Sequence, residues 1–240
     1  MLYFHKIFNK NAPGVGKNAK KQVIMSRKNT SLIIKSIIAL SVVVGVIIQV
    51  FEIQSAMLFF TIHSNIWIGI TCIVGILLAV RNIPVKRWMY SVKLMFTVSI
   101  TLTGVVFCTM LAPFMGDEAF TFSNILLHVV VPVLSVADFF VYDYFIEFKK
   151  WECVIATVPP IFYLLFAGIG YALNWDFGYG GQNYPYYFLN WGSPAGAFGF
   201  SSESPYIGVF YYVLILSAFV IGIAALYILI ARRMRLNRAK

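Results

Sequence analysis

The sequence predicts an all-α integral membrane protein, a bundle of six transmembrane helices with both termini on the cytoplasmic side. Its 240 residues are 60% hydrophobic and only 12% charged, a balance typical of membrane proteins rather than soluble domains. Apolar runs of about 20 residues recur along the chain, and each is long enough to cross a hydrocarbon core of about 30 Å as a helix. Lys and Arg are confined to one side of these runs, which predicts the orientation.

The transmembrane domain is expected to cover residues 32–231. Its six spans are predicted, in chain order, at 32–51, 57–80, 88–112, 122–146, 151–172 and 206–231. Residues 1–31 before it are predicted to form a basic, disordered cytoplasmic arm, and residues 232–240 a basic cytoplasmic tail.

The loops on the two sides of these spans differ in charge. The arm, the loop after the second span and the tail carry Lys and Arg, whereas the opposite side carries Glu52, Asp117, Glu118, Asp176 and Glu203. Because basic flanks are retained in the cytoplasm, we expect a multi-pass protein of the cell membrane with both termini cytoplasmic. The net charge of +10 is then a topology signal that also favours anionic membrane lipids, and no nucleic-acid partner is expected.

Cysteine usage suggests no metal site and no disulfide framework. Cys72 and Cys108 lie in predicted spans and Cys153 opens the fifth, with no CxxC spacing. We interpret them as small buried hydrophobic residues and expect neither a metal nor another cofactor.

The second span opens with a cluster of polar residues, FTIHSN, that hydrocarbon would disfavour. Helical spacing puts Ser64 and Asn65 on the face of Thr61, whereas His63 points about 200° away. A face turned to the bundle interior would explain the cluster.

The fourth span carries His128 at nearly the depth of Thr61, with Asn124 and Ser135 on the same face. The sequence therefore predicts a hydroxyl and an imidazole at one level. The ordinary alternative is structural, since an isolated Thr in a membrane helix usually bonds its own i−4 carbonyl and a lone His is more often structural than catalytic.

Lys93 and Asp138 are a pair of opposite charges inside the predicted spans, near the cytoplasmic ends. We expect a structural ion pair, with a proton relay, or a Lys93 that reaches out to the interface, as the alternatives.

The segment 173–205 is long for a loop and rich in aromatic residues and Gly. It is predicted to be a lid over the outward mouth of a site, with an interfacial aromatic anchor as the alternative. Its candidate lid residues are Trp175, Tyr184, Tyr186, Tyr187 and Trp191.

Three phrases, FTIHSN, LLHVVVPVLSVADFFVYD and YPYYFLN, resemble the Pr6Pr family of bacterial six-helix membrane proteins, over about residues 32 to 231. That family is similar to the androgen-induced and androgen-dependent TFPI-regulating proteins of animals, which are membrane hydrolases that cleave fatty acid esters of hydroxy fatty acids with an intramembrane Thr and His. The resemblance implies that Thr61 and His128 hold these roles. One departure is Asn190, which stands where an Asp is expected and has no assigned role.

The implied activity is hydrolysis of a lipid ester that enters from the outer leaflet. His128 would act as general base for the Thr61 nucleophile, and Ser64, Asn65 or Asn124 would stabilise the oxyanion. Two other classes fit the same polar face, namely a small-solute transporter or channel and a non-catalytic membrane subunit. No Gly- or Pro-broken half-helices occur in corresponding positions, which disfavours the transporter.

Overall fold

The computed structural model describes residues 17–178 and 181–239, and in this part of the chain the regular structure is helical. Six helical segments are long and apolar enough to cross a membrane, which confirms the predicted six-span membrane bundle. They are Met25–Glu52, Phe60–Val80, Arg87–Phe120, Phe122–Val141, Glu152–Ala172 and Val209–Asn237.

Three of the spans are single α-helices and three are interrupted. The single helices are α2 (Lys17–Glu52), α3 (Phe60–Val80) and α10 (Val209–Ala239). The third span joins α4 (Arg87–Val106), the π-helical turn η2 (Phe107–Leu111), α5 (Ala112–Met115) and η3 (Gly116–Phe120). The fourth joins α6 (Phe122–Ile125), the π-helical turn η4 (Leu126–Val130) and α7 (Val131–Val141), and the fifth joins α8 (Glu152–Ile155) and α9 (Val158–Ala172).

The ends of the helices differ from the predicted ones in three places. Residues 17–31, predicted as disordered, form the start of α2. This stretch lacks Gly and Pro, the two strongest helix breakers, and contains four Lys, which favour helix. The first 16 residues of the predicted arm lie outside the described residues. The predicted tail continues α10 to Ala239, and the fourth span ends at Val141 instead of 146, where the short 3-10 helix η5 (Asp143–Phe145) follows.

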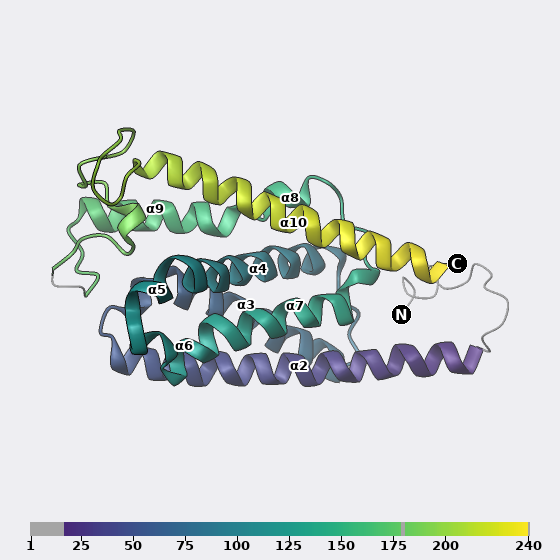
Figure 1. The fold of residues 1–240 in the computed structure, drawn as a ribbon. Coiled ribbons are helices and arrows are strands. Elements are labelled where there is room, and N and C mark those ends of the chain that lie inside the picture. The colour runs from purple at the N-terminus through teal and green to yellow at the C-terminus, as the bar shows by residue number, and fades with distance from the viewer. Residues whose placement is uncertain (1–16, 179–180, 240) are drawn as a thin grey trace.

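Helix α4 lies at the centre of the bundle, because it contacts α3 and α7 on one side and α9 and α10 on the other. Helix α2 packs against α3 and α7, so that α2, α3, α4 and α7 form a four-helix group, with α9 and α10 across α4 from it (Figure 1). The start of α2 and the end of α10 lie at the same end of the bundle. We call this the basic end, since it carries the Lys and Arg residues of the loops.

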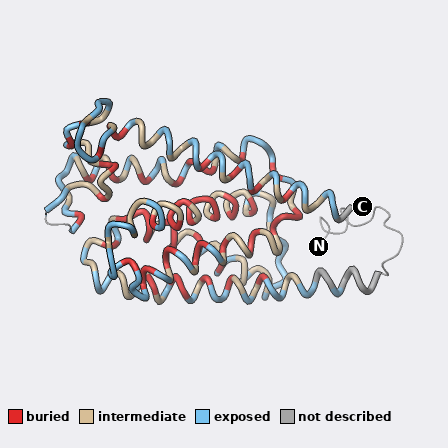
Figure 2. The backbone as a smooth tube through the Cα atoms, viewed as in Figure 1, coloured by how far each residue is buried: buried red, intermediate tan, exposed pale blue. Residues whose placement is uncertain are grey.

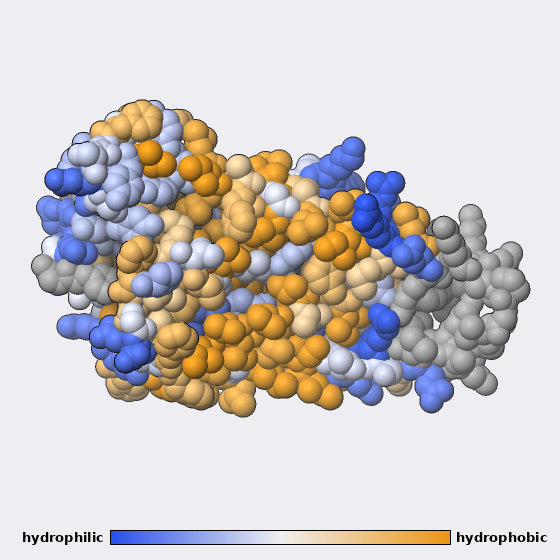
Figure 3. Space-filling view, viewed as in Figure 1, coloured by the Kyte–Doolittle hydropathy of each residue, from blue (hydrophilic) through white to orange (hydrophobic). Residues whose placement is uncertain are grey.

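The outward faces of the helices are exposed, whereas buried residues line the faces that meet (Figure 2). On the face shown in Figure 3, hydrophobic residues cover most of the middle, and hydrophilic residues gather toward both ends. Among the exposed apolar side chains are Phe51, Phe114, Phe162, Leu165 and Leu226. Such a band is what a bilayer would cover.

A fully buried apolar layer crosses the four-helix group. It is formed by Ile38 of α2, Ile68 of α3, Ile100 of α4 and Val131 of α7, which pack in one cluster. In each of the four spans, polar residues lie on both sides of the residue that belongs to the layer. The layer therefore separates two buried polar centres.

Candidate active site

The first polar centre lies around Thr61 and His128, and two π-helical turns shape it. Turns η2 and η4 each end two residues before a proline, at Leu111 and Val130. A proline has no N–H to donate to the carbonyl four residues before it, and wide turns of this kind are often found at functional sites. The side chains of Phe107 and His128, one from each turn, stack with ring centroids 3.8 Å apart and an interplanar angle of 17°.

Gly104 allows α4 and η4 to approach this closely. A Cβ atom at Gly104 would lie 2.9 Å from the carbonyl oxygen of His128 and 3.0 Å from the Cβ of Pro132. Any larger residue would push the two segments apart, and Phe107 and His128 with them.

The structure brings Thr61 and His128 together. The Thr61 Oγ1 lies 3.1 Å from the His128 Nε2, and the two residues are only 8% and 5% exposed. The other ring nitrogen, Nδ1, lies 3.1 Å from the backbone carbonyl oxygen of Asn124. A carbonyl oxygen only accepts hydrogen bonds, so Nδ1 carries the proton. In the neutral ring, Nε2 is then the acceptor and the Thr61 hydroxyl donates to it.

The Thr61 hydroxyl is unlike several others in the second, third and fourth spans, which donate to the backbone of their own span. The side chains of Thr71, Ser99, Thr101, Thr109 and Ser135 each donate to the carbonyl four residues earlier. Thr61 lies in the first turn of α3, so the residue four positions before it, Met57, lies outside that helix. The Met57 carbonyl instead accepts from His63 Nε2 at 2.9 Å. The start of the helix thus leaves the Thr61 hydroxyl to interact across the bundle.

The residues predicted to support an oxyanion hold the local backbone instead. Asn65 Nδ2 donates to the carbonyls of Thr61 and Leu127, and Asn124 Nδ2 donates to that of Glu118. Ser64 Oγ lies 3.1 Å from the Thr61 carbonyl oxygen and 2.7 Å from the hydroxyl of Thr103. The Ser64 hydroxyl, both amide hydrogens of Asn65 and one of the two of Asn124 are therefore already engaged.

The first turn of α3 offers another donor. The N–H of Phe60 donates to the Tyr186 hydroxyl, and those of Ile62 and His63 donate to the Phe59 carbonyl. Among the described residues, the N–H of Thr61 itself has no acceptor. Such N–H groups at a helix start are unsatisfied within the helix and carry a partial positive charge.

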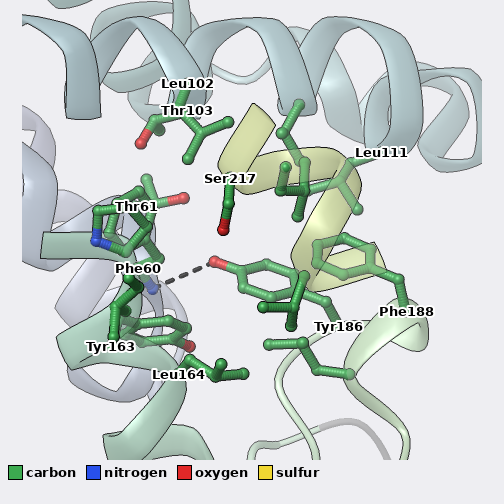
Figure 4. A pocket seen from close by; sticks show the side chains of 16 residues that line it. Phe60, Thr61, Leu102, Thr103, Leu111, Tyr163, Leu164, Tyr186, Phe188 and Ser217 are labelled. Carbon is green, nitrogen blue, oxygen red and sulfur yellow. Dashed lines mark hydrogen bonds between the residues drawn. The ribbon is translucent and has the colours of Figure 1, made fainter. Parts of the chain in front are cut away.

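A cavity of about 80 Å³ lies beside Thr61, lined by residues of α3, α4, η2, α9, α10 and the loop before α10. Figure 4 shows that Tyr186 reaches into it from the loop, with its hydroxyl on the backbone N–H of Phe60. Most of the lining is apolar, and its hydroxyl groups come from Thr61, Thr103, Tyr163, Tyr186 and Ser217. Thr61 is thus shared by the polar centre and an apolar cavity.

Of the five candidate lid residues, only Tyr186 lines this cavity, together with Phe188 and Leu189, which the sequence analysis did not single out. Three others pack on the helices below the loop: Trp175 on Phe166, Tyr187 on Tyr212 and Trp191 on Tyr171. Tyr184 is half-buried outside the lining. Residues 179–180 of the predicted lid lie outside the described residues.

The remaining polar residues of the motifs lie away from the site. His63 packs among the rings of Trp67, Tyr163 and Phe166, on the face away from Thr61 as its helical position predicts. Asn190 Oδ1 accepts from the backbone N–H of Gly192, within a turn of the loop.

The second polar centre lies on the basic side of the apolar layer. Lys93 Nζ lies 2.8 Å from Asp138 Oδ2, so the expected partners meet. Lys35 of α2, which was not predicted to take part, contacts both oxygens of the same carboxylate with its Nζ at 2.8 Å. Its position inside the first predicted span was a signal that could have identified it. Ser31 Oγ donates to Asp138 Oδ1 at 2.6 Å. Two buried cations therefore share one carboxylate, which we call the charge centre.

The cysteines take no part in either centre except for Cys72, whose sulfur lies 3.7 Å from Lys93 Nζ. Cys72 is buried, whereas Cys108 is exposed and Cys153 half-buried, so the interpretation as buried residues is wrong for Cys108. In the described part of the chain no group of three or more His, Cys, Asp and Glu side chains could hold a metal ion.

Asp143, which follows the fourth span, should make stability depend on pH. Burial raises its pKa most, the charge of Lys35 lowers it, the nearby Asp138 raises it and Lys93 lowers it, and the net result is a pKa of about 6. The pKa in the unfolded chain is about 3.9, so the folded state binds the proton more tightly. The contribution of Asp143 to the free energy of unfolding should therefore fall as pH rises from about 4 through 6 and level off above.

This pH dependence is measured as the unfolding temperature in detergent between pH 4.5 and 8. Over this range the unfolding temperature of the wild type should fall relative to that of Asp143→Asn, and Asp117→Asn, which changes an exposed aspartate, should follow the wild type. An unchanged slope in Asp143→Asn would assign the effect to another group.

In comparisons with known proteins, no family model, curated protein or solved structure matches this chain.

Proposed function

We propose that this chain is an intramembrane hydrolase of lipid esters, with Thr61 as nucleophile and His128 as general base. One observation carries the proposal: the Thr61 hydroxyl donates to an imidazole nitrogen whose protonation is fixed by the Asn124 carbonyl, at the wall of an apolar cavity. A nucleophile, a base and a group that orients the base are the arrangement that activates a hydroxyl.

The reaction follows from these contacts. His128 Nε2 takes the proton of Thr61 while Oγ1 attacks the ester carbonyl carbon, and the C=O electron pair moves to oxygen. The tetrahedral intermediate collapses, the bond to the alcohol oxygen breaks, and the proton on Nε2 passes to the leaving alcohol. Water then attacks the acyl-Thr61 ester with His128 again as base, which releases the fatty acid and restores the hydroxyl.

We assign the oxyanion to the backbone N–H of Thr61 rather than to the predicted Ser64, Asn65 or Asn124. These three already donate elsewhere, whereas the N–H of Thr61 has no acceptor among the described residues. A preorganised donor in a site that excludes water stabilises developing charge strongly, and the partial charge at the helix start adds to it.

The cavity favours a substrate with an acyl chain. Its lining is mostly leucine, isoleucine, valine, proline and aromatic side chains from four spans and the loop. Together with the resemblance to the Pr6Pr family, this supports fatty acid esters of hydroxy fatty acids, or similar lipid esters, drawn from the bilayer.

We also place the protein in the cell membrane with both termini in the cytoplasm. The Lys and Arg residues of the loops gather at the end of the bundle where α2 begins and α10 ends. The site would then lie in the outer half of the membrane.

The transporter alternative is less consistent with the interior. A polar solute crossing the four-helix group would meet the layer of Ile38, Ile68, Ile100 and Val131, which is fully buried.

A fluorophosphonate probe, which reacts with activated hydroxyls, tests the proposal. Purified protein in detergent should be labelled, with the modification on Thr61, and labelling should be lost in Thr61→Ala and His128→Ala. Thr71→Ala is the matched control, because it removes a hydroxyl of the same helix that is bonded to the Trp67 carbonyl. Equal labelling of Thr61→Ala and the wild type would refute the assignment of the nucleophile.

A further inference from the structure

A second site lies at the basic end, far from Thr61 along the bundle. A groove of about 360 Å³ is lined by Arg87, Trp88, Ser91, Lys149 and Trp151, and we call it the basic groove. Its residues come from the first turns of α4 and from the segment that leads into α8. Neither the proposed reaction nor the charge centre uses any of them.

The acid beneath the groove is neutralised. Glu152 has a side chain only 1% exposed, and its carboxylate accepts from Arg87 at 2.7 Å, from Ser91 at 2.5 Å and from the backbone N–H of Lys149 at 2.5 Å. Arg87 also donates to the carbonyl of Glu147 and lies over the ring of Phe148. These contacts fix the guanidinium at the wall of the groove and balance the buried carboxylate.

The net charge that faces solvent is therefore positive. In the described part of the chain the ammonium group of Lys149 has no ion-pair or hydrogen-bond partner. The exposed Lys150 follows it in sequence, and the exposed Lys86 precedes Arg87. The other nearby acid, Glu147, pairs with Arg235 at 3.8 Å. An anion in the groove would meet Lys149 and the edge of Arg87, and no carboxylate of the described residues lines the groove.

The aromatic residues point to the kind of anion. Trp88 is 60% and Trp151 51% exposed, which is unusual for such large side chains in water. Trp prefers the headgroup level of a membrane, where its ring meets both apolar chains and polar groups. A basic pocket between membrane helices flanked by Trp suits a phosphate that is attached to acyl chains.

We propose that the basic groove binds the phosphate of an anionic glycerophospholipid. Lys149 and Arg87 contact the phosphate, Ser91 lies at the floor, and the first segments of the acyl chains lie against Trp88 and Trp151. This proposal stands whether or not the chain hydrolyses esters.

Titration of delipidated, detergent-solubilised protein with phosphatidylglycerol, followed by native mass spectrometry, tests it. Lys149→Gln should weaken binding of the first lipid about fivefold, since one phosphate contact is lost. Lys150→Gln is the matched control, because it removes an equally exposed neighbouring charge outside the lining and should leave affinity within twofold. Phosphatidylcholine should bind more weakly than phosphatidylglycerol to the wild type and be insensitive to both changes.

Phosphatidylglycerol with brominated chains gives a second readout, since bromine quenches tryptophan fluorescence on contact. Quenching should fall in Trp88→Phe and in Trp151→Phe relative to Trp191→Phe, which changes a residue of the opposite end. An equal loss of affinity in Lys149→Gln and Lys150→Gln would reduce the site to diffuse surface charge. Displacement of the lipid by millimolar inorganic phosphate would identify a site for a free phosphate instead, and either result overturns the proposal.

Discussion

Replacing Thr61 or His128 with alanine should each reduce ester hydrolysis by at least about a hundredfold, and the double variant should be little worse than either single one. The two side chains act as one unit through the 3.1 Å contact between Oγ1 and Nε2, so their effects should not add. The measurement is release of free fatty acid by purified, detergent-solubilised protein from esters of varied chain length. Thr61→Ser, which keeps a hydroxyl, should retain part of the activity.

The fold should survive these changes. Each removes one small contact or ring, at a cost of about 1 to 3 kcal/mol, so the unfolding temperature serves as the control. If the wild type and both variants release only background fatty acid across the series, the hydrolase proposal fails and the transporter alternative takes its place. If Thr61→Ala hydrolyses esters as fast as the wild type, Thr61 is not the nucleophile that His128 activates.

Replacing Asp138 with asparagine should produce the largest loss of stability in the molecule, about 3 to 5 kcal/mol. The change removes the carboxylate that Lys35 and Lys93 share, 2.8 Å from each, and among the described residues leaves only the more distant Asp143 as a nearby acid for both. Removing one member of a buried ionic group exposes the full desolvation cost of the others. The free energy of unfolding, from denaturant titration in mixed micelles, measures the effect.

Lys35→Met is the informative comparison, because it leaves the pair of Lys93 and Asp138 intact and removes one buried cation. It should cost less than Asp138→Asn and should leave hydrolysis unchanged, since the apolar layer separates the charge centre from Thr61. If Lys35→Met destabilises the protein as much as Asp138→Asn does, the carboxylate is not what balances the two cations. A loss of hydrolysis in folded Lys35→Met protein would show that the two centres are coupled.

Much of the architecture could be predicted because a bilayer leaves few solutions. A chain in hydrocarbon must satisfy its backbone hydrogen bonds internally, so a long apolar run can only be a helix, and its length gives the span. The six spans followed from this rule. The level of Thr61 and His128 also followed, since depth and face depend only on helical rise and rotation within each span.

The boundaries and the roles of single residues could not be predicted in the same way. Residues 17–31 are helical because local propensity extends α2 beyond the apolar run on which the prediction relied. Asn65 and Asn124 donate to carbonyls that only the packed helices bring near them.

The sequence by itself therefore determined that the chain forms six membrane-spanning helices and that a threonine and a histidine occupy one level. Only the tertiary structure decided that Phe107 stacks on His128, that Lys35 joins the charge centre and that Tyr186 lines the cavity beside Thr61. The physical reason is the range of the forces involved. Helix formation and depth depend on neighbours in sequence and on the bilayer, whereas these contacts depend on how α2, α4 and the loop before α10 pack against helices distant in sequence.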